Sequence, residues 1–345
     1  LEKPDINYSS SKFSIESKSN NSKSIRFALS AIKGVGLVSM NNVVKEREKS
    51  GKYTDVIDFM TRLEGDVINK RQIEKLIQAG AFDSIYNNRR KLFNNVVNFV
   101  QIFGGIKQKS SDQTLLFEEN KISFEDKALF IQDVEEWSPN SLLKYELEVI
   151  GFYFSNHPLS YYPKIFFKEN NILNYIDILK NDNLRNVKLV GSILDIKERS
   201  NREGKKYAFL TISNIDSQYE ITIFSDVLKL YKNILKEGKV LLFNVDTMND
   251  NGNLRIIVRK IQELEIFFSN QKYKINLFLS DFNNLEVLKN IVSKKSTNNN
   301  LFFVFIKKDS KLISLDFSKN YEICDYLELD KLHEAKKIDY SLEIQ

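Results

Sequence analysis

The chain has 345 residues, of which 42% are hydrophobic and 12% aromatic, so it holds enough apolar material for ordinary folded cores. At about 100 to 200 residues per domain, this length indicates two or three compact units. The 51 basic and 46 acidic side chains leave a net charge of +5, which permits a polyanionic partner without requiring one. Disorder throughout is excluded, and charge alone does not define a function.

Cysteine and histidine are scarce, with only Cys324, His157 and His333 in the sequence. An internal disulfide and a structural zinc site of Cys and His ligands are therefore excluded. We interpret Cys324 as a small buried apolar residue and His157 as a loop-anchoring hydrogen bonder. Short apolar runs and the lack of disulfides predict a cytoplasmic chain with no membrane partner. No carboxylate pair suggests a two-metal catalytic site.

The first third of the chain is predicted to be helical around two glycine turns. Residues 1–24 are rich in Ser, Asn and Lys and indicate a loop. Apolar spacing predicts helices over 25–33 and 37–49, then over 71–78 and 89–103. These two pairs predict a tandem helix-hairpin-helix domain over residues 25–112.

The turn Gly34-Val35-Gly36, preceded by Lys33, fits the hairpin of such an element. Glycine permits positive φ, and amides at the start of the next helix can face a phosphate, to which Lys33 would add a cation. Such contacts hold nucleic acid by its backbone without reading sequence. The alternative is a turn in which Gly36 only allows tight packing, and the tripeptide does not decide between them. At Gly80, which lacks a second glycine, a helix C-cap is favoured.

Residues 113–186 combine a short peptide with connecting helices, predicted over 126–131 and 138–154. The peptide Gln113-Thr114-Leu115-Leu116-Phe117 follows a turn-rich linker, so its apolar side chains have no obvious helix to join. It can dock on a partner, with the amide of Gln113 fixing the register. Composition alone favours the simpler interpretation, in which the apolar side chains anchor a loop.

From Val187 the apolar period changes from 3.6 to 2. Strands are predicted over 187–195, 207–215, 219–224, 239–248 and 254–261, with a helix over 225–237. Three strands, a helix and two strands within about eighty residues is the order of the oligonucleotide-binding (OB) barrel, which we place at 187–265. Other small barrels remain open. Residues 266–345 are predicted to form a small α/β module with a strand over 274–279, a helix over 283–293, a hairpin over 301–317 and a helix over 328–337. The fold class is therefore multidomain α+β.

A basic cluster around the first barrel turn is the second candidate nucleic-acid contact. Its members are Lys197, Arg199, Arg202, Lys205 and Lys206, followed by Tyr207 and Phe209. Cations that follow phosphates, interleaved with rings that stack on bases, suit single-stranded nucleic acid. The alternative is that both rings point into the barrel core and the basic turn is only solvated.

Five segments, taken in order, resemble the C-terminal part of the bacterial replicative DNA polymerase III alpha subunit. They are Pro4-Asp5-Ile6-Asn7, Ala31-Ile32-Lys33-Gly34-Val35-Gly36, residues 76–83, residues 113–117 and residues 146–159. The last segment is the most specific, because Gly-Phe-Tyr followed by His-Pro-Leu has little generic structural reason to recur. The matches cover about residues 1–265.

The resemblance implies a role for each part. Residues 1–24 would end the fingers, and Lys33, Gly34, Val35, Gly36 and Gly80 would contact duplex DNA. Residues Gln113, Leu115, Leu116 and Phe117 would anchor an internal sliding-clamp (beta subunit) motif. The barrel would contact single-stranded template, and residues 266–345 would bind the clamp-loader tau subunit.

The family's catalytic palm, where Mg²⁺ binds, lies before the match at Pro4. Because the chain also begins at Leu1 instead of Met, we expect it to continue a longer protein and to hold no catalytic residue, metal or cofactor itself. It would support processive DNA synthesis without polymerising alone. The alternatives are a stand-alone nucleic-acid-processing enzyme with an appended OB-fold, or an adaptor whose barrel binds only protein.

Overall fold

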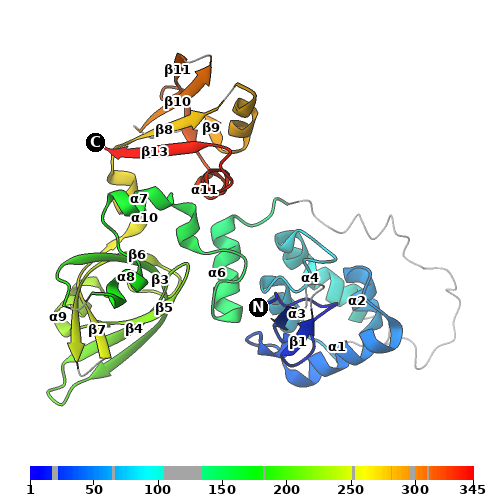
Figure 1. Cartoon of the computed structure of the whole chain (residues 1–345). Helices are drawn as coiled ribbons and strands as arrows, with labels where there is room; N and C mark the ends of the chain where they lie inside the picture. The colour runs from blue at the N-terminus through cyan, green and yellow to red at the C-terminus, as the bar shows by residue number, and fades with distance from the viewer. Residues whose placement is uncertain are drawn as a thin grey trace, which may run out of the picture. The chain divides into compact units, whose positions relative to one another are not determined.

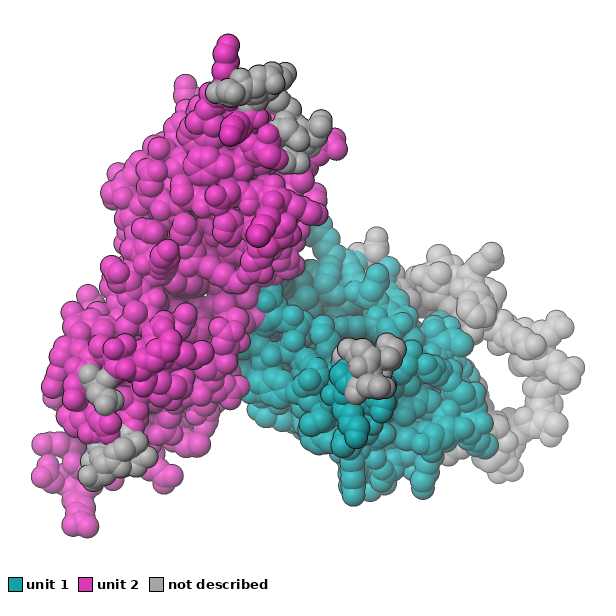
Figure 2. Space-filling view, viewed as in Figure 1, with its two compact units in different colours: residues 1–156 teal, residues 157–345 magenta. Residues whose placement is uncertain are grey.

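The computed structural model describes residues 1–17, 22–63, 67–104, 134–181, 183–250, 253–280, 282–294, 300–308 and 311–345. They form two compact units, Leu1–Asn156 and His157–Gln345 (Figures 1 and 2). The boundary between the two units thus falls before His157. The reason is that α6 (Pro139–Ile150) contributes Val149 and Ile150 to the core of the first unit.

The first unit holds three of the four helices that were predicted for its two hairpins. β1 (Ser14–Ser17) pairs with β2 (Lys23–Arg26), and the short 3-10 helix η1 (Leu29–Ala31) precedes α1 (Leu37–Ser50) and α2 (Val56–Arg62). α3 (Lys70–Gln78) and α4 (Arg89–Gly104) follow as predicted. The helix predicted over 25–33 is wrong. Glu2 exchanges backbone hydrogen bonds with Ile25 and Phe27, and this pairing holds the segment extended up to η1.

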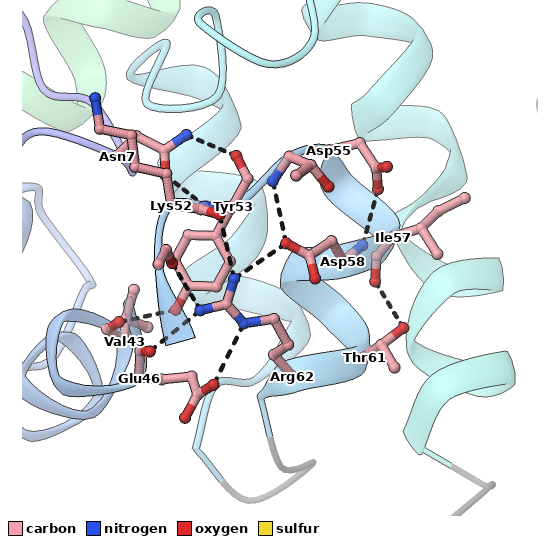
Figure 3. Close-up of polar contacts among 12 residues, drawn as sticks. Asn7, Val43, Glu46, Lys52, Tyr53, Asp55, Ile57, Asp58, Thr61 and Arg62 are labelled. Atoms are coloured by element: carbon pink, nitrogen blue, oxygen red, sulfur yellow. Dashed lines mark hydrogen bonds and ion pairs between the residues drawn. The ribbon is translucent and has the colours of Figure 1, made fainter. Parts of the chain in front are cut away.

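A buried tyrosine joins the N-terminal segment to α1 and α2 (Figure 3). The Tyr53 hydroxyl donates to the Val43 carbonyl at 2.8 Å, and the Asn7 side chain exchanges two hydrogen bonds of 2.8 Å with the Tyr53 backbone. The Arg62 guanidinium lies 4.4 Å from the ring centre and pairs with Asp58 at 3.1 Å. Burial raises the pKa of Tyr53 to about 12, so the hydroxyl remains a donor. The segment 4–7 is therefore an anchor of this unit.

One buried carboxylate organises the loop that follows α6. Glu146 is 1% exposed and accepts hydrogen bonds from the backbone N–H of Phe154 at 3.1 Å, from that of Ser155 at 3.0 Å and from the Ser155 hydroxyl. It also pairs with the Arg89 guanidinium of α4 at 3.3 Å. Gly151, with φ of +94°, ends α6 and turns the chain back toward Glu146. The most specific sequence match, 146–159, thus includes a loop held by its own first residue.

The second unit contains a closed five-stranded barrel. Its strands are β3 (Val187–Ser200), β4 (Lys206–Ser213), β5 (Gln218–Ile223), β6 (Val240–Asp250) and β7 (Asn253–Glu263), with α9 (Ser225–Tyr231) between β5 and β6. The strands close in the order β3-β4-β5-β7-β6, which is the OB order, and the prediction is confirmed. Antiparallel pairing joins the neighbours except β5 and β7, which meet in parallel at Thr222 and Ile257.

The C-terminal module is a four-stranded sheet in the order β11-β10-β8-β13. The elements are β8 (Tyr273–Leu279), η3 (Phe282–Asn290), β9 (Val292–Lys294), β10 (Leu301–Lys308), β11 (Lys311–Asp316), β12 (Tyr321–Ile323), α11 (Tyr326–Glu334) and β13 (Asp339–Ile344). The hairpin of β10 and β11 is confirmed. The helix predicted over 283–293 is a 3-10 helix followed by β9, which pairs with β12. Cys324 is exposed, so its interpretation as buried is wrong: Ile323 takes the inward position beside it.

Short elements connect the barrel to the preceding chain and to the C-terminal module. They are η2 (Pro158–Tyr161), α7 (Lys164–Glu169), α8 (Tyr175–Leu179) and α10 (Leu264–Asn270). Phe166 of α7 joins the core of the C-terminal module, whereas Ile178 of α8 joins the barrel core. Within the described ranges no helix has the length and apolar character needed to cross a membrane, and no three potential metal ligands gather.

We expect the substitution His157→Asn to reduce the loss of stability that the second unit undergoes as the pH falls. Burial lowers the pKa of His157 from 6.5 to about 4, and a hydrogen bond with the Ser213 backbone only partly opposes this shift. As the pH falls, the imidazole of the unfolded chain is protonated near 6.5, well before that of the folded chain. Stability present above pH 6.5 is therefore lost progressively toward pH 4, by about 2 kcal/mol at about pH 5.

Urea unfolding followed by circular dichroism at about pH 7 and about pH 5 measures this loss. Asn retains an oxygen that can accept the Leu159 N–H, as Nδ1 of His157 does at 3.1 Å, but it does not titrate. The control His333→Gln replaces the other histidine of the sequence, whose side chain is 47% exposed, and the loss of stability is compared between the two variants. An unaltered pH dependence in His157→Asn would contradict the assignment.

Candidate nucleic-acid interface

A groove with a volume of about 880 Å³ crosses the outer face of the barrel. Its floor is formed by β4, β5 and β7, the last of which contributes Leu254 near its start, and the β3–β4 connection contributes Lys205. OB-folds bind oligonucleotides and oligosaccharides with the face of the corresponding strands and with the loop that corresponds to the β3–β4 connection.

Tyr207 and Phe209 of β4 lie on the groove floor. Ala208 and Leu210 alternate with them and are 0% exposed in the barrel core, so both rings point outward. The ring centroids are 5.4 Å apart in an edge-to-face arrangement. The alternative that these rings fill the barrel core is therefore wrong. Phe224, which is 49% exposed, adds a third ring to the groove.

The basic cluster divides between the groove and its surroundings. Lys205 and Lys206 line the groove beside Tyr207. Lys197 and Arg199 share the outer face because they lie opposite Phe209 and Tyr207 in the β3–β4 register, but they do not line the groove. Arg202 is exposed in the turn between these strands and does not line it either.

Acidic neighbours accompany these lysines. Lys197 pairs with Asp195 at 3.3 Å, Lys205 with Glu203 at 3.3 Å, and Lys206 lies 4.0 Å from Glu198. All these side chains are well exposed, and exposed pairs contribute about 0–1 kcal/mol. A phosphate can therefore replace the acidic partner at small cost.

Sequence reasoning missed several groove residues that come from other elements of the barrel and its surroundings. They are Tyr175, Glu220, Thr222, Phe224, Met248 and Arg255. Their individual sequence neighbourhoods carry no binding signal. Only the closed strand order, which places β7 beside β5, brings Arg255 to the same groove as Lys206.

The first hairpin presents Lys33 at the surface and buries Val35. Gly34 has φ of +84°, as the turn requires, whereas Gly36 is extended and caps the 14-residue helix α1. A Cβ at Gly36 would lie 3.3 Å from the Gln72 amide, so close packing is a second reason for glycine there. The structure thus shows the turn and its close packing, and a phosphate contact at this turn stays a prediction.

Gly80 lies in a Schellman C-cap of α3. Its N–H donates to the Ile77 carbonyl at 2.9 Å, that of Ala81 donates to Leu76 at 2.9 Å, and φ is +76°. A Cβ would lie 2.2 Å from the Arg89 guanidinium. Gly80 is buried and has no free amide to offer a phosphate, so the C-cap interpretation applies and we leave it out of the interface.

The peptide of Gln113, Leu115, Leu116 and Phe117 lies outside the described residues, as does the helix predicted over 126–131. The hypothesis that this peptide is a clamp-binding motif therefore rests on the sequence alone.

Residues 1–92 match the helix-hairpin-helix motif family. A solved structure of the mitochondrial single-stranded DNA binding protein Rim1 from S. cerevisiae is 19% identical, with a TM-score of 0.21, over 23% of this chain and 90% of that one. The helix-hairpin-helix match and the closed barrel order define a multidomain α+β protein with helix-hairpin-helix and OB-fold modules.

Relatives in sequence are DNA polymerase III alpha subunits. That of Borreliella burgdorferi is 30% identical over 96% of this chain and 30% of its own length. Those of Rickettsia bellii and Aquifex aeolicus are 31% and 29% identical over 80% and 85% of this chain, and 23% and 24% of their own lengths. The resemblance to the DNA polymerase III alpha subunit is confirmed, and the chain spans between a fifth and a third of the length of these relatives.

Proposed function

We propose that this chain binds DNA within a replicative DNA polymerase III alpha subunit and supports processive DNA synthesis. The groove on the barrel is the observation that carries this proposal. It combines the cations Lys205, Lys206 and Arg255 with the outward rings of Tyr207 and Phe209. Rings stack on bases of any sequence and cations follow phosphates, so the groove suits single-stranded DNA bound without strict sequence preference.

The first hairpin would hold duplex DNA by its backbone. The start of α1 is exposed at Leu37 and Val38, beside the exposed Lys33. Amides at the N-terminus of a helix of this length, with the positive end of its dipole, favour a phosphate oxygen. The Lys33 ammonium would add a second favourable charge on the same side of the turn.

Fluorescence anisotropy with a labelled single strand of about 15 nucleotides tests the proposal. If three groove cations neutralise three phosphates, the logarithm of the binding constant should fall with the logarithm of salt with a slope of about −2. The double variant Lys205→Ala with Lys206→Ala should make the slope shallower by roughly 1.4. Absence of binding, or binding that salt does not weaken, would exclude the groove as a DNA site.

We also propose that the sliding clamp binds the peptide at 113–117, with the Gln113 amide fixing the register and Leu115, Leu116 and Phe117 filling an apolar pocket. The double variant Gln113→Ala with Phe117→Ala should abolish binding of the chain to the purified clamp in calorimetry. Thr114→Ala, in the same peptide, should bind as the wild type does. Unchanged clamp affinity in the double variant would contradict the proposal that residues 113–117 bind the clamp.

The C-terminal module, residues 266–345, is proposed to meet the clamp-loader tau subunit, as the family resemblance implies. Its open sheet face carries Phe278 and Phe305 stacked at 5.3 Å, and aromatic residues are enriched at protein interfaces. Calorimetric titration of the chain with purified tau checks this proposal.

A further inference from the structure

We propose that Glu220 makes the groove prefer bases that carry an exocyclic amino group over thymine. The inference rests on the proposed binding of single-stranded DNA in this groove and adds which bases the groove favours. It arises from the single carboxylate among the residues that line the groove.

The strand alternation fixes where Glu220 points. Its neighbours Tyr219 and Ile221 are 5% and 1% exposed in the barrel, so Glu220 and Thr222 face outward on β5. In the β4–β5 register Phe209 lies opposite Thr222, which places Glu220 diagonally from Phe209 on the same face. Diagonal neighbours of this kind lie about 7–8 Å apart. A base stacked on Phe209 therefore presents its edge within reach of the Glu220 carboxylate.

The chemistry of that edge decides which bases fit. An ionised carboxylate only accepts hydrogen bonds. Among the described residues Glu220 forms no hydrogen bond or ion pair, so its acceptor capacity faces the groove. Cytosine and adenine offer an exocyclic amino donor to such an acceptor, whereas thymine has a carbonyl oxygen at that position and keeps only its ring N3–H as a donor. Guanine also carries an amino group and belongs with the favoured bases.

An unpaired carboxylate in a groove that binds a polyanion carries an electrostatic cost. A hydrogen bond from an amino group offsets part of that cost, and a thymine carbonyl adds repulsion instead. The cations Lys205 and Lys206 come from the β3–β4 connection and the start of β4, while Glu220 lies on the floor. With this placement, phosphates would contact Lys205 and Lys206 at the rim of the groove, and the edges of the bases would contact Glu220 on its floor.

Anisotropy titrations with oligomers of deoxycytidine and deoxyuridine, each of about 15 nucleotides, test the inference. Cytosine and uracil share the ring and differ at the exocyclic group, and uracil lacks the thymine methyl. We expect the wild type to bind the cytidine oligomer about 5- to 10-fold more tightly, within the range of one good base contact. Glu220→Gln, whose amide both donates and accepts, should reduce this ratio to about 1–2.

Glu237→Gln is the matched control, since it removes one exposed carboxylate of the same unit outside the groove and should leave the ratio as in the wild type. If Glu220→Gln strengthens binding of both oligomers equally, the carboxylate acts only through its charge and the inference is wrong. If the wild type binds neither oligomer, the proposed function of the groove fails and the inference fails with it.

Discussion

Replacement of Glu146 by alanine is expected to lower the free energy of unfolding of the first unit by about 3–5 kcal/mol, the range for breaking a buried ion pair by removing one partner. The substitution leaves the backbone N–H groups of Phe154 and Ser155 and the Ser155 hydroxyl without their acceptor. It also takes from the nearly buried Arg89 one of its two carboxylate partners, the other being Asp83 at 2.6 Å.

Trp137 reports on this unit alone, because it is the single tryptophan of the sequence. It packs against Phe93 and Tyr145, with ring centroids at 5.3 and 4.3 Å, so its fluorescence follows urea unfolding of the helical unit. Glu148→Ala is the control: this side chain, also on α6, is 51% exposed, and its pair with Lys75 is worth at most about 1 kcal/mol. Equal effects of the two substitutions would show that the buried network does not stabilise the fold.

The double variant Tyr207→Ala with Phe209→Ala is expected to weaken binding of single-stranded DNA by about 30-fold or more. Each ring that stacks on a base contributes about 1–3 kcal/mol, so two rings contribute at least about 2 kcal/mol. Both rings lie on the outer face, and the inward residues Ala208 and Leu210 are unchanged. The barrel should therefore remain folded while the stacking surface is lost.

Anisotropy at one fixed salt concentration measures this loss, and circular dichroism checks the fold. Tyr321→Ala removes a ring that is 39% exposed in the C-terminal module and should leave affinity unchanged. A loss of less than about threefold in the double variant would mean that these rings do not stack on bases in the complex.

The barrel could be predicted from the sequence because strand alternation is a local signal. Its five strands are indicated by the change of period at Val187, and their succession along the chain, with one helix after the third strand, indicates the OB barrel. The groove could be predicted only in part. Lys205, Lys206 and Tyr207 are adjacent in sequence, but Glu220 and Arg255 reach the same groove through the closed strand order. The acidic partners of the lysines lie near them in the sequence, but the approach of Lys206 to Glu198 depends on the pairing of β3 with β4.

The failed prediction of a helix over 25–33 has a non-local cause. Phe27 and Ile32 are buried as a helix would bury them, but backbone pairing with Glu2 holds the preceding segment extended. Likewise Gly80 could be seen as a turn residue, whereas its contact with the Arg89 guanidinium requires α4 to be in place. Helix caps were predictable where one residue suffices, as at Ser138, whose hydroxyl accepts the Ser141 N–H.

The barrel closes between β5 and β7 at one registered residue pair, while its other neighbouring strands share six or more. Both members of that pair, Thr222 and Ile257, line the groove. The barrel should first open locally between β5 and β7, since few backbone hydrogen bonds join these two strands. A strand of DNA lying across them would contact both at once. Binding of DNA in the groove should therefore slow amide hydrogen exchange along β5 and β7, because it stabilises the least strongly paired strands of the barrel.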